Sequence, residues 1–285
     1  MADEKKFSGW KRRYIAFLNA VTVVCIIVGC FIHIGGFIGA DIYRSIWHSD
    51  TRTIRSDEGS GSNYAAQQFQ SIDGDVSMGS VVLTQGDSYS CTYEKYPDNA
   101  LPSIEIEDGE LKITQKAKNA RTFGDMSFKG SYNDAKIIIT VPEDAVVDTK
   151  LRLNMGAFEA ENCTTGELNI EADMGSIEVS DCKVKDLDLR AHMGGITVED
   201  TTFDSGEFKA DMGGITVNDC TFDNGEFKAD MGGIDVEATF NKMEAKCSMG
   251  GISVEASNDD AKMNLSADVG GISVNGKDRG RKYKN

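Results

Sequence analysis

Between Leu151 and Val274 the chain repeats one short pattern seven times, and this periodicity constrains the fold more than any other feature of the sequence. Each copy carries a methionine, a glycine, a small residue and then a large apolar residue. The copies begin at Met155, Met174, Met193, Met212, Met231 and Met249, and at Val269, where valine replaces methionine. The first four steps are 19 residues long, and the last two are 18 and 20. A fixed period near 20 residues is typical of a repeat architecture.

Within each copy, apolar and polar residues alternate with the period of two that is typical of a β-strand. Before the fourth signature, Phe208, Ala210 and Met212 fall on the same face of the strand, so we expect the methionine to point inward with the other two. The alternation then changes phase at Gly213 and Gly214. Because glycine adopts positive φ at little cost, a glycine pair at a phase change predicts a corner.

Aligning the copies places similar residues in columns. The large apolar column is Phe158, Ile177, Ile196, Ile215, Ile234, Ile252 and Ile272. A second column is Ala160, Val179, Val198, Val217, Val236, Val254 and Val274. A third, small column is Ala172, Ala191, Ala210, Ala229, Cys247 and Ala267. One copy alone has nothing to bury these side chains against, so its stability must come from stacking on its neighbours.

The sequence therefore predicts an all-β fold, a parallel, single-stranded β-solenoid (β-helix) whose coils of 19 residues have one long and two short faces. A β-propeller needs repeats of about 40 residues, whereas the columns here align after each single copy of about 19. A calcium-binding β-roll needs glycine-rich nonapeptides, which this sequence lacks. We assign the regular coils to residues 151–276. Residues 66–150 are expected to form irregular β turns that also cap the solenoid, with Met78-Gly79-Ser80-Val81 as a degenerate copy of the signature. Residues 277–285 are predicted to be a basic, frayed tail.

The amino-terminal region has the pattern of a membrane anchor. Residues 1–13 are polar and basic, and residues 14–40 form an apolar stretch long enough to cross the ~30 Å hydrocarbon core. Because the cationic cluster precedes the span, we expect residues 1–13 in the cytoplasm, 14–40 as a single transmembrane helix and the rest of the chain outside. Residues 41–65 end in Ser-Gly-rich sequence, which predicts a linker. A cleaved signal peptide is the alternative, although its apolar core usually has only about 7–15 residues.

The charge distribution limits the classes of partner, and the cysteine positions indicate how the thiols are used. The net charge of −16 is carried by the middle of the chain, because both ends are basic. Such an acidic body argues against nucleic acid as a partner, which requires a basic face. The cysteines have no zinc-binding spacing, and Cys163, Cys182 and Cys220 share one column with Thr201 and Thr239. This placement predicts buried thiols, although Cys163 and Cys182 would be close enough for a disulfide.

Two segments before the repeats, together with the apolar amino-terminal span, carry a resemblance to a known family. Ile104–Thr114 reads IEIEDGELKIT, and Lys136–Pro142 reads KIIITVP and leads into the Met-Gly-x-Ile repeats. With these features the chain resembles, over residues 66–275, the DUF4097 family, whose members are described as adhesins and are found in bacterial envelope proteins. The resemblance implies a β-helical envelope domain, tied in some relatives to envelope stress responses, and it supplies no catalytic residue.

These features favour a membrane-anchored, extracellular and non-enzymatic module that binds or scaffolds at the bacterial cell envelope. The expected partner is an envelope or host glycan or protein, and the oligomeric state stays open. An alternative is a partner in envelope-stress sensing. Its output would need a second protein, because residues 1–13 are too few for a catalytic domain.

An enzyme that cleaves acidic polysaccharides is a further alternative, since such sites need clustered carboxylates with a base. An aspartate precedes the signature in four copies, and stacked carboxylates attract Ca²⁺. These calcium candidates are Asp173, Asp211, Asp230 and Asp268. His192 and Ser248 interrupt the series, and His192 is far in sequence from the other histidines. We therefore assign no catalytic residue, no cofactor and no metal ligand beyond these four candidates.

Overall fold

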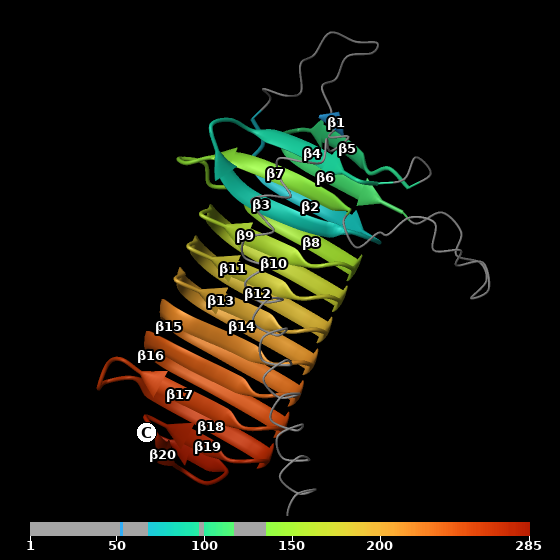
Figure 1. Cartoon of the computed structure of the whole chain (residues 1–285). Coiled ribbons are helices and arrows are strands. Elements are labelled where there is room, and N and C mark those ends of the chain that lie inside the picture. The colour runs from blue at the N-terminus through green and yellow to red at the C-terminus, as the bar shows by residue number, and fades with distance from the viewer. Residues whose placement is uncertain (1–51, 54–67, 97–99, 117–134) are drawn as a thin grey trace, which may run out of the picture. The chain divides into compact units, whose positions relative to one another are not determined.

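A computed structural model describes residues 52–53, 68–96, 100–116 and 135–285. Over these residues the chain is all-β, and its strands join one continuous sheet that winds as a parallel β-solenoid (Figure 1). The fold predicted for the repeats is confirmed. In the same part of the chain, no helix is long and apolar enough to cross a membrane. The expected cytoplasmic and transmembrane segments, 1–13 and 14–40, lie outside the described residues.

Each regular coil contributes a long and a short strand, and neighbouring coils pair in parallel with like residues in register. The long strands are β8 (Asp148–Met155), β10 (Thr164–Met174), β12 (Lys183–Met193), β14 (Thr202–Met212) and β18 (Lys262–Val269). The short strands are β9 (Phe158–Glu161), β11 (Ile177–Ser180), β13 (Ile196–Glu199), β17 (Ile252–Ala256) and β19 (Ile272–Val274). In two coils the short and long strands run on as one, in β15 (Ile215–Met231) and β16 (Ile234–Met249).

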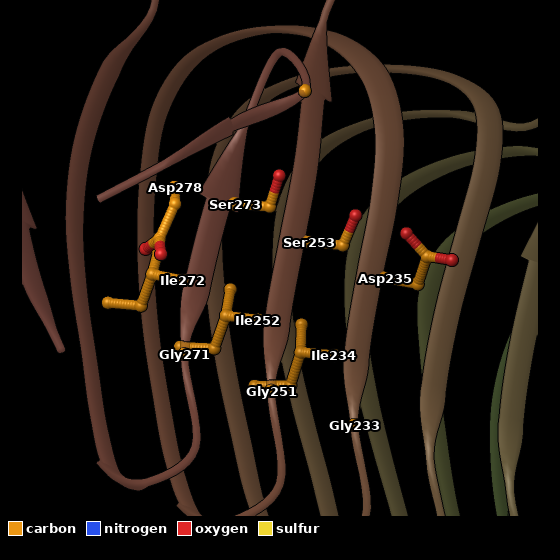
Figure 2. Close-up of a pocket in the computed structure, with 11 residues that line it drawn as sticks. Gly233, Ile234, Asp235, Gly251, Ile252, Ser253, Gly271, Ile272, Ser273 and Asp278 are labelled. Atoms are coloured by element: carbon orange, nitrogen blue, oxygen red, sulfur yellow. The ribbon is translucent and has the colours of Figure 1, made fainter. Parts of the chain in front are cut away.

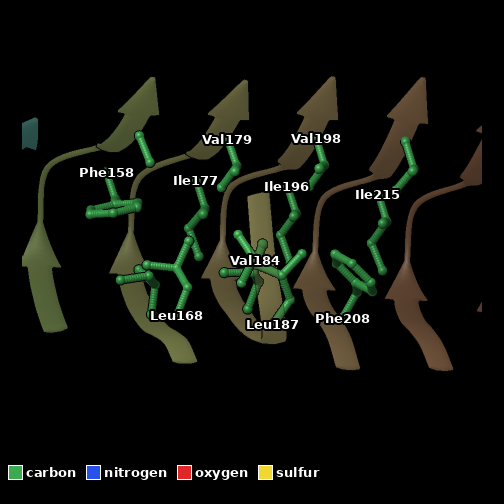
Figure 3. Packing of buried hydrophobic residues seen from close by; sticks show 14 of the residues in the cluster. Phe158, Leu168, Ile177, Val179, Val184, Leu187, Ile196, Val198, Phe208 and Ile215 are labelled. Atoms are coloured by element: carbon green, nitrogen blue, oxygen red, sulfur yellow. The ribbon is translucent and has the colours of Figure 1, made fainter. Parts of the chain in front are cut away.

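The interior of the solenoid is filled by the columns that the sequence predicted. The large apolar column (called the isoleucine column below), the valine column and the small column are buried throughout. Figure 3 shows members of the isoleucine and valine columns side by side from coil to coil. Ile196 of β13 and Ile215 of β15, for example, are fully buried register partners. Burying one such side chain contributes roughly 1.5–3 kcal/mol, so stacking supplies the stability that a single coil lacks.

Residue sizes also compensate within a coil, which the columns alone did not predict. The position that holds a leucine in β12 holds Gly206 in β14, where Phe203 and Phe208 occupy the space. A Cβ at Gly206 would lie 2.5 Å from the Phe208 ring and 2.8 Å from the Phe203 ring. Both rings stack on those of the next coil, with centroids 4.8 Å apart for Phe203 and Phe222 and 4.7 Å apart for Phe208 and Phe227. The core is therefore repacked from coil to coil at close to constant volume.

The cysteine column follows a second corner, at which four residues in the left-handed region turn the chain. These residues are Asn162, Asp181, Asp200 and Asp219, with φ between 48° and 56°. The backbone N–H of Cys163 donates to Cys182 Sγ at 3.4 Å, and both thiols are buried and unbridged. Burial raises the pKa of Cys220 to about 11, which keeps this thiol protonated at neutral pH. Thr239 does not belong to this column: the register shifts after Asn218, and Ala238 lies beside Cys220 instead.

The amino-terminal strands add two further coils, and the coil that comes first in the sequence lies between the second coil and the regular repeats. β2 (Ser71–Val76) and β3 (Ser80–Gly86) stack directly on β8 and β9, and β6 (Glu110–Gln115) and β7 (Lys136–Pro142) stack on their other side. The chain thus forms the inner coil first and the outer coil second. Antiparallel strands then cover the outer coil (Figure 1), namely β1 (Arg52–Thr53), β4 (Ser90–Glu94) and β5 (Ser103–Glu107).

The last residues form a second cap, so the prediction of a frayed tail at 277–285 is wrong. β20 (Lys277–Asp278) pairs antiparallel with β19, and β21 (Lys282–Lys284) pairs antiparallel with β18. The turn into β20 is Asn275-Gly276, with φ of 50° and 68°. Two successive residues at positive φ are typical of the tight hairpin turn that Asn-Gly favours. The pairing covers the open edge of the last coil.

Candidate functional site

One corner of the solenoid, between the end of the long strand and the start of the short strand, carries the repeat signature. In each coil this corner presents a polar residue, most often aspartate, then the methionine or valine of the signature, and then the glycine positions. We define the methionine ridge as Met174, Met193, Met212, Met231, Met249 and Val269. The corner therefore places charged, apolar and bare backbone surfaces side by side, in stripes that run from coil to coil.

The methionine ridge is exposed, which contradicts the inward orientation expected from the alternation. Met193 and Met212 are each 43% exposed, whereas Phe208 and Ala210 are buried as expected. The alternation stops early because two consecutive residues, such as His192 and Met193, lie outside the coil where the chain turns into the glycines. Among the described residues, Val146 is the one exposed large hydrophobic residue outside the ridge. An ordered row of exposed apolar side chains is typical of an interaction surface.

The two glycines that follow each methionine have different roles. At the first, Gly213, φ is 150° and a Cβ would lie 2.0 Å from the carbonyl oxygen of Gly194, so only glycine fits. At the second, Gly214, a Cβ would meet the oxygen of Gly233 at 3.4 Å, which is an ordinary contact. Ser176 takes this second position in an earlier coil. The turn does not require the second glycine, whose lack of a side chain leaves the surface beside the ridge open.

The open glycine column ends in a hollow of about 600 Å³ near the carboxyl terminus (Figure 2). The backbone of Gly233, Gly251 and Gly271 lines it. Its polar side chains are Asp235, Ser253, Ser273 and Asp278. Because these residues include two carboxylates and no basic side chain, the hollow favours a ligand with hydrogen-bond donors or positive charge.

Of the four calcium candidates, the structure brings two together around His192. Asp173, His192 and Asp211 occupy the same position in β10, β12 and β14, so they are neighbours across the sheet. Asp230 follows in β15, where the hydroxyl of Ser248 donates to Asp230 Oδ1 at 3.4 Å.

Asp268 lies beyond Ser248, two coils from Asp230. The candidate carboxylates therefore do not form one continuous row, and among the described residues three potential metal ligands converge only in β10 and β12.

His192 is the centre of a cluster that sequence reasoning missed. Its Nδ1 lies 2.6 Å from Asp211 Oδ2, and its Nε2 lies 3.3 Å from Glu171 Oε1 and 3.9 Å from Asp173 Oδ1. One donor atom each from Glu171, Asp173 and His192 lie within 4.8 Å of one another, so these three residues could hold a metal ion. The signal that could have found the cluster is the period itself, because 192 is one repeat from both 173 and 211.

The carboxylates change the acidity of the imidazole. The hydrogen bond to Asp211 and then that to Glu171 raise the pKa of His192, since both favour its charged form. The same contact with His192 lowers the pKa of Asp211. Chemically, the cluster offers one imidazole and several carboxylates to a cation or a proton.

The outer face beside this cluster is charge-balanced rather than uniformly acidic. Arg190 Nε lies 2.9 Å from Asp188 Oδ1, and Lys228 Nζ lies 2.6 Å from Glu226 Oε1. Exposed pairs of this kind contribute about 0–1 kcal/mol each to stability. Their consequence is instead that the long face presents alternating stripes of opposite charge.

Known proteins match both the sequence and the fold. A family model described as Toastrack DUF4097 matches residues 65–285. A crystal structure of a protein named “putative adhesin” from Bacteroides fragilis is 21% identical, with a TM-score of 0.57, and the match covers 79% of this chain and 96% of that one. Another protein of the same name, from Parabacteroides merdae, is 14% identical, with a TM-score of 0.50, and the match covers 79% and 95%. At these identities the likeness concerns the fold alone. No curated protein matches the sequence.

Proposed function

Because the chain belongs to the Toastrack DUF4097 family, we propose that it is a non-enzymatic, adhesin-like interaction module of the bacterial cell envelope. Two structural neighbours carry the name “putative adhesin”. A stack of coils presents a long and regular surface, which is how solenoid proteins engage their partners. The proposed activity is therefore binding, through the corner that carries the repeat signature.

The observation that carries this proposal is the methionine ridge. Its methionines are register partners from coil to coil, and they stay 41–52% exposed. Packing does not require methionine at this position, and exposed apolar area is unfavourable in water. Methionine is flexible and polarizable, and surfaces rich in it adapt to partners of varied shape. A binding role accounts for a feature that folding alone does not.

The columns beside the ridge favour a protein partner. Asp173, Asp211 and Asp230 directly precede three of the ridge methionines, so a complementary partner presents apolar side chains bordered by basic ones. In the described part of the chain, the exposed large hydrophobic residues are methionine and valine, and the aromatic side chains are at least half-buried. Of the two partner classes expected from the sequence, protein fits this surface better than glycan.

The test is a binding screen of the full-length chain, solubilised in detergent, against purified envelope proteins, peptidoglycan fragments and glycans. A triple variant Met193→Ser, Met212→Ser, Met231→Ser is expected to lose at least tenfold in affinity for a protein ligand. The matched control carries serine at Glu207, Glu226 and Glu244, which lie in another outer column of neighbouring coils. Equal affinity of the ridge variant and the unmodified chain would contradict the proposal, and so would binding to glycans alone.

The proposal also places the solenoid outside the cell, held by residues 14–40 as a single transmembrane helix, with residues 41–65 as a tether. Protease added to intact cells is then expected to degrade the repeats while sparing residues 1–13. Protection of the repeats until the cells are lysed would exclude this location, whatever the binding screen shows.

A further inference from the structure

We propose that Glu171, Asp173 and His192 form a binding site for one divalent transition-metal ion of the zinc class, with Asp211 positioning the imidazole. This site goes beyond the interaction function proposed above and does not depend on the methionine ridge.

The three donors converge because of their places in two neighbouring strands. Glu171 and Asp173 are two residues apart in β10, so both side chains lie on the outer face, and His192 lies beside Asp173 in β12. Nε2 of His192 is 3.3 Å from Glu171 Oε1 and 3.9 Å from Asp173 Oδ1. Ligand atoms bound to zinc at about 2.0–2.2 Å lie roughly 3.4 Å apart around a tetrahedron. Small side-chain rotations therefore suffice to bring all three donors to one ion.

Two departures from the repeat pattern meet at this site. In the copies from Met155 to Val269, the residue three before the signature is basic in five cases, Arg152, Arg190, Lys209, Lys228 and Lys246. Glu171 is the acidic exception in that column, and His192 is the imidazole in a column that otherwise carries aspartate, asparagine or serine. Aspartates alone recur in this column and would not assign a site. What assigns it is that the added carboxylate and the added imidazole contact each other.

The imidazole of His192 has the orientation that a metal ligand needs. In the neutral tautomer in which Nδ1–H donates to Asp211 Oδ2, at 2.6 Å, the lone pair of Nε2 faces Glu171 and Asp173. Histidine ligands almost always donate their other ring N–H to a carboxylate or carbonyl, which fixes the tautomer. A lone pair beside two carboxylates attracts a cation: without metal a proton can take this place on Nε2, and a bound metal ion displaces that proton.

The surrounding charges leave room for a divalent ion. Arg152 Nη2 lies 3.7 Å from Glu171 Oε1 and 3.8 Å from Asp173 Oδ1, beyond hydrogen-bond distance. The guanidinium therefore offsets charge without occupying the lone pairs of the oxygens. Lys209 Nζ lies 3.2 Å from Asp211 Oδ1 and so contacts the positioning residue rather than a donor. Three carboxylates still outnumber these two cations.

The donor set selects the metal. Calcium prefers six to eight oxygen ligands, whereas one nitrogen and two carboxylates suit zinc and its neighbours among the transition metals. Three protein donors leave a further position for water or for a donor from a partner molecule.

The test is a calorimetric titration of the full-length chain, solubilised in detergent, with Zn²⁺. The unmodified chain is expected to bind one ion at His192, and the variants below are expected to bind it more weakly. His192→Asp gives the site the residue of Asp173 and Asp211, and it is expected to bind zinc at least tenfold more weakly although it adds a carboxylate. Glu171→Lys, which matches Lys209, is expected to have the same effect. Both variants carry residues that neighbouring coils accommodate, so both are expected to fold, as circular dichroism without metal will show.

The positioning role of Asp211 has its own readout. Asp211→Asn is expected to weaken zinc binding about 10–100-fold and to change the tautomer of His192, seen in the ¹⁵N shifts of its ring nitrogens. His33 and His48 remain in every variant, so a difference between variants is due to the β10–β14 cluster. Equal zinc affinity of the unmodified chain and His192→Asp overturns the proposal. So do ring-nitrogen shifts of His192 that zinc leaves unchanged, because the imidazole then serves only as a proton-bearing partner of the carboxylates.

Discussion

The inside and the outside of the same corner repeat with equal regularity, yet for different reasons. Inside, the isoleucine, valine and small columns are at most 3% exposed, and each residue is needed to fill the coil. Outside, the methionine ridge repeats over the same coils at 41–63% exposure. Periodicity in a sequence therefore indicates that copies stack, but it does not tell which side of the coil a repeated residue serves. A repeated residue that packing does not need indicates function.

The largest effect on stability is expected when a charge is introduced at a buried position rather than at the exposed position next to it. Ile215 is fully buried, whereas its neighbour Thr216 faces outward and pairs in register with Asp235. Ile215→Lys loses the burial of an isoleucine and leaves an unpaired ammonium group in the core, so it should cost more than about 4 kcal/mol. Thr216→Lys should change stability by less than about 0.5 kcal/mol.

Thermal unfolding of the full-length chain, followed by circular dichroism at the strand signal, measures both variants. If the two lysines lower the melting temperature equally, the assignment of inside and outside is wrong.

A smaller difference is expected between the two glycines of one corner. Gly213→Ala brings a Cβ within 2.0 Å of a backbone oxygen at a φ of 150°, so strain and displacement of the strand should cost roughly 2–4 kcal/mol. Gly214→Ala makes only an ordinary contact and should be within about 0.5 kcal/mol of the unmodified chain. Chemical denaturation provides both free energies of unfolding. A Gly214→Ala variant as unstable as Gly213→Ala would show that both glycines are structural. The open surface beside the methionine ridge would then need no functional reason.

The repeats made the interior predictable because a buried column has to be continuous. Every member of the isoleucine column could be named from spacing alone, and each is buried. The size exchange between Gly206 and the rings of Phe203 and Phe208 was not predicted, because it depends on side chains that meet across the coil. Thr239 was placed in the wrong column because β16 lacks one corner residue, which shifts the register by one.

The ends of the stack were harder to predict, since local patterns carry no information on which coil stacks on which. The signature at Met78-Gly79 indicated a coil, and the backbone N–H of Gly79 indeed donates to the Met155 carbonyl at 2.9 Å. Nothing in the sequence placed β6 and β7 outside that coil. Asn275-Gly276, in contrast, was a readable hairpin signal directly before the tail that was predicted to fray.

At the candidate site, the column chosen from the sequence runs through the cluster, but its histidine was not chosen. Asp173 and Asp211 were chosen as calcium candidates, whereas His192 was treated as isolated because the other histidines are distant in sequence. The distance that matters in a solenoid is one period, and across it His192 is adjacent to both aspartates. Glu171 could not be chosen from the aspartate series, since it lies in a neighbouring column and reaches the imidazole only through its side chain.

The smallest effect on stability is expected from the ridge itself, and two methionines allow a matched test. Met212 is 43% exposed on the ridge, whereas Met243 is fully buried in β16. Met243→Ala removes packed atoms from the core and should cost about 2–5 kcal/mol. Met212→Ala removes the same atoms from a surface position and should cost less than about 0.5 kcal/mol. Denaturant unfolding of the two variants separates the outcomes. A loss above about 1 kcal/mol for Met212→Ala would mean that the ridge stabilises the stack, and the argument that its methionines are present for binding would lose its basis.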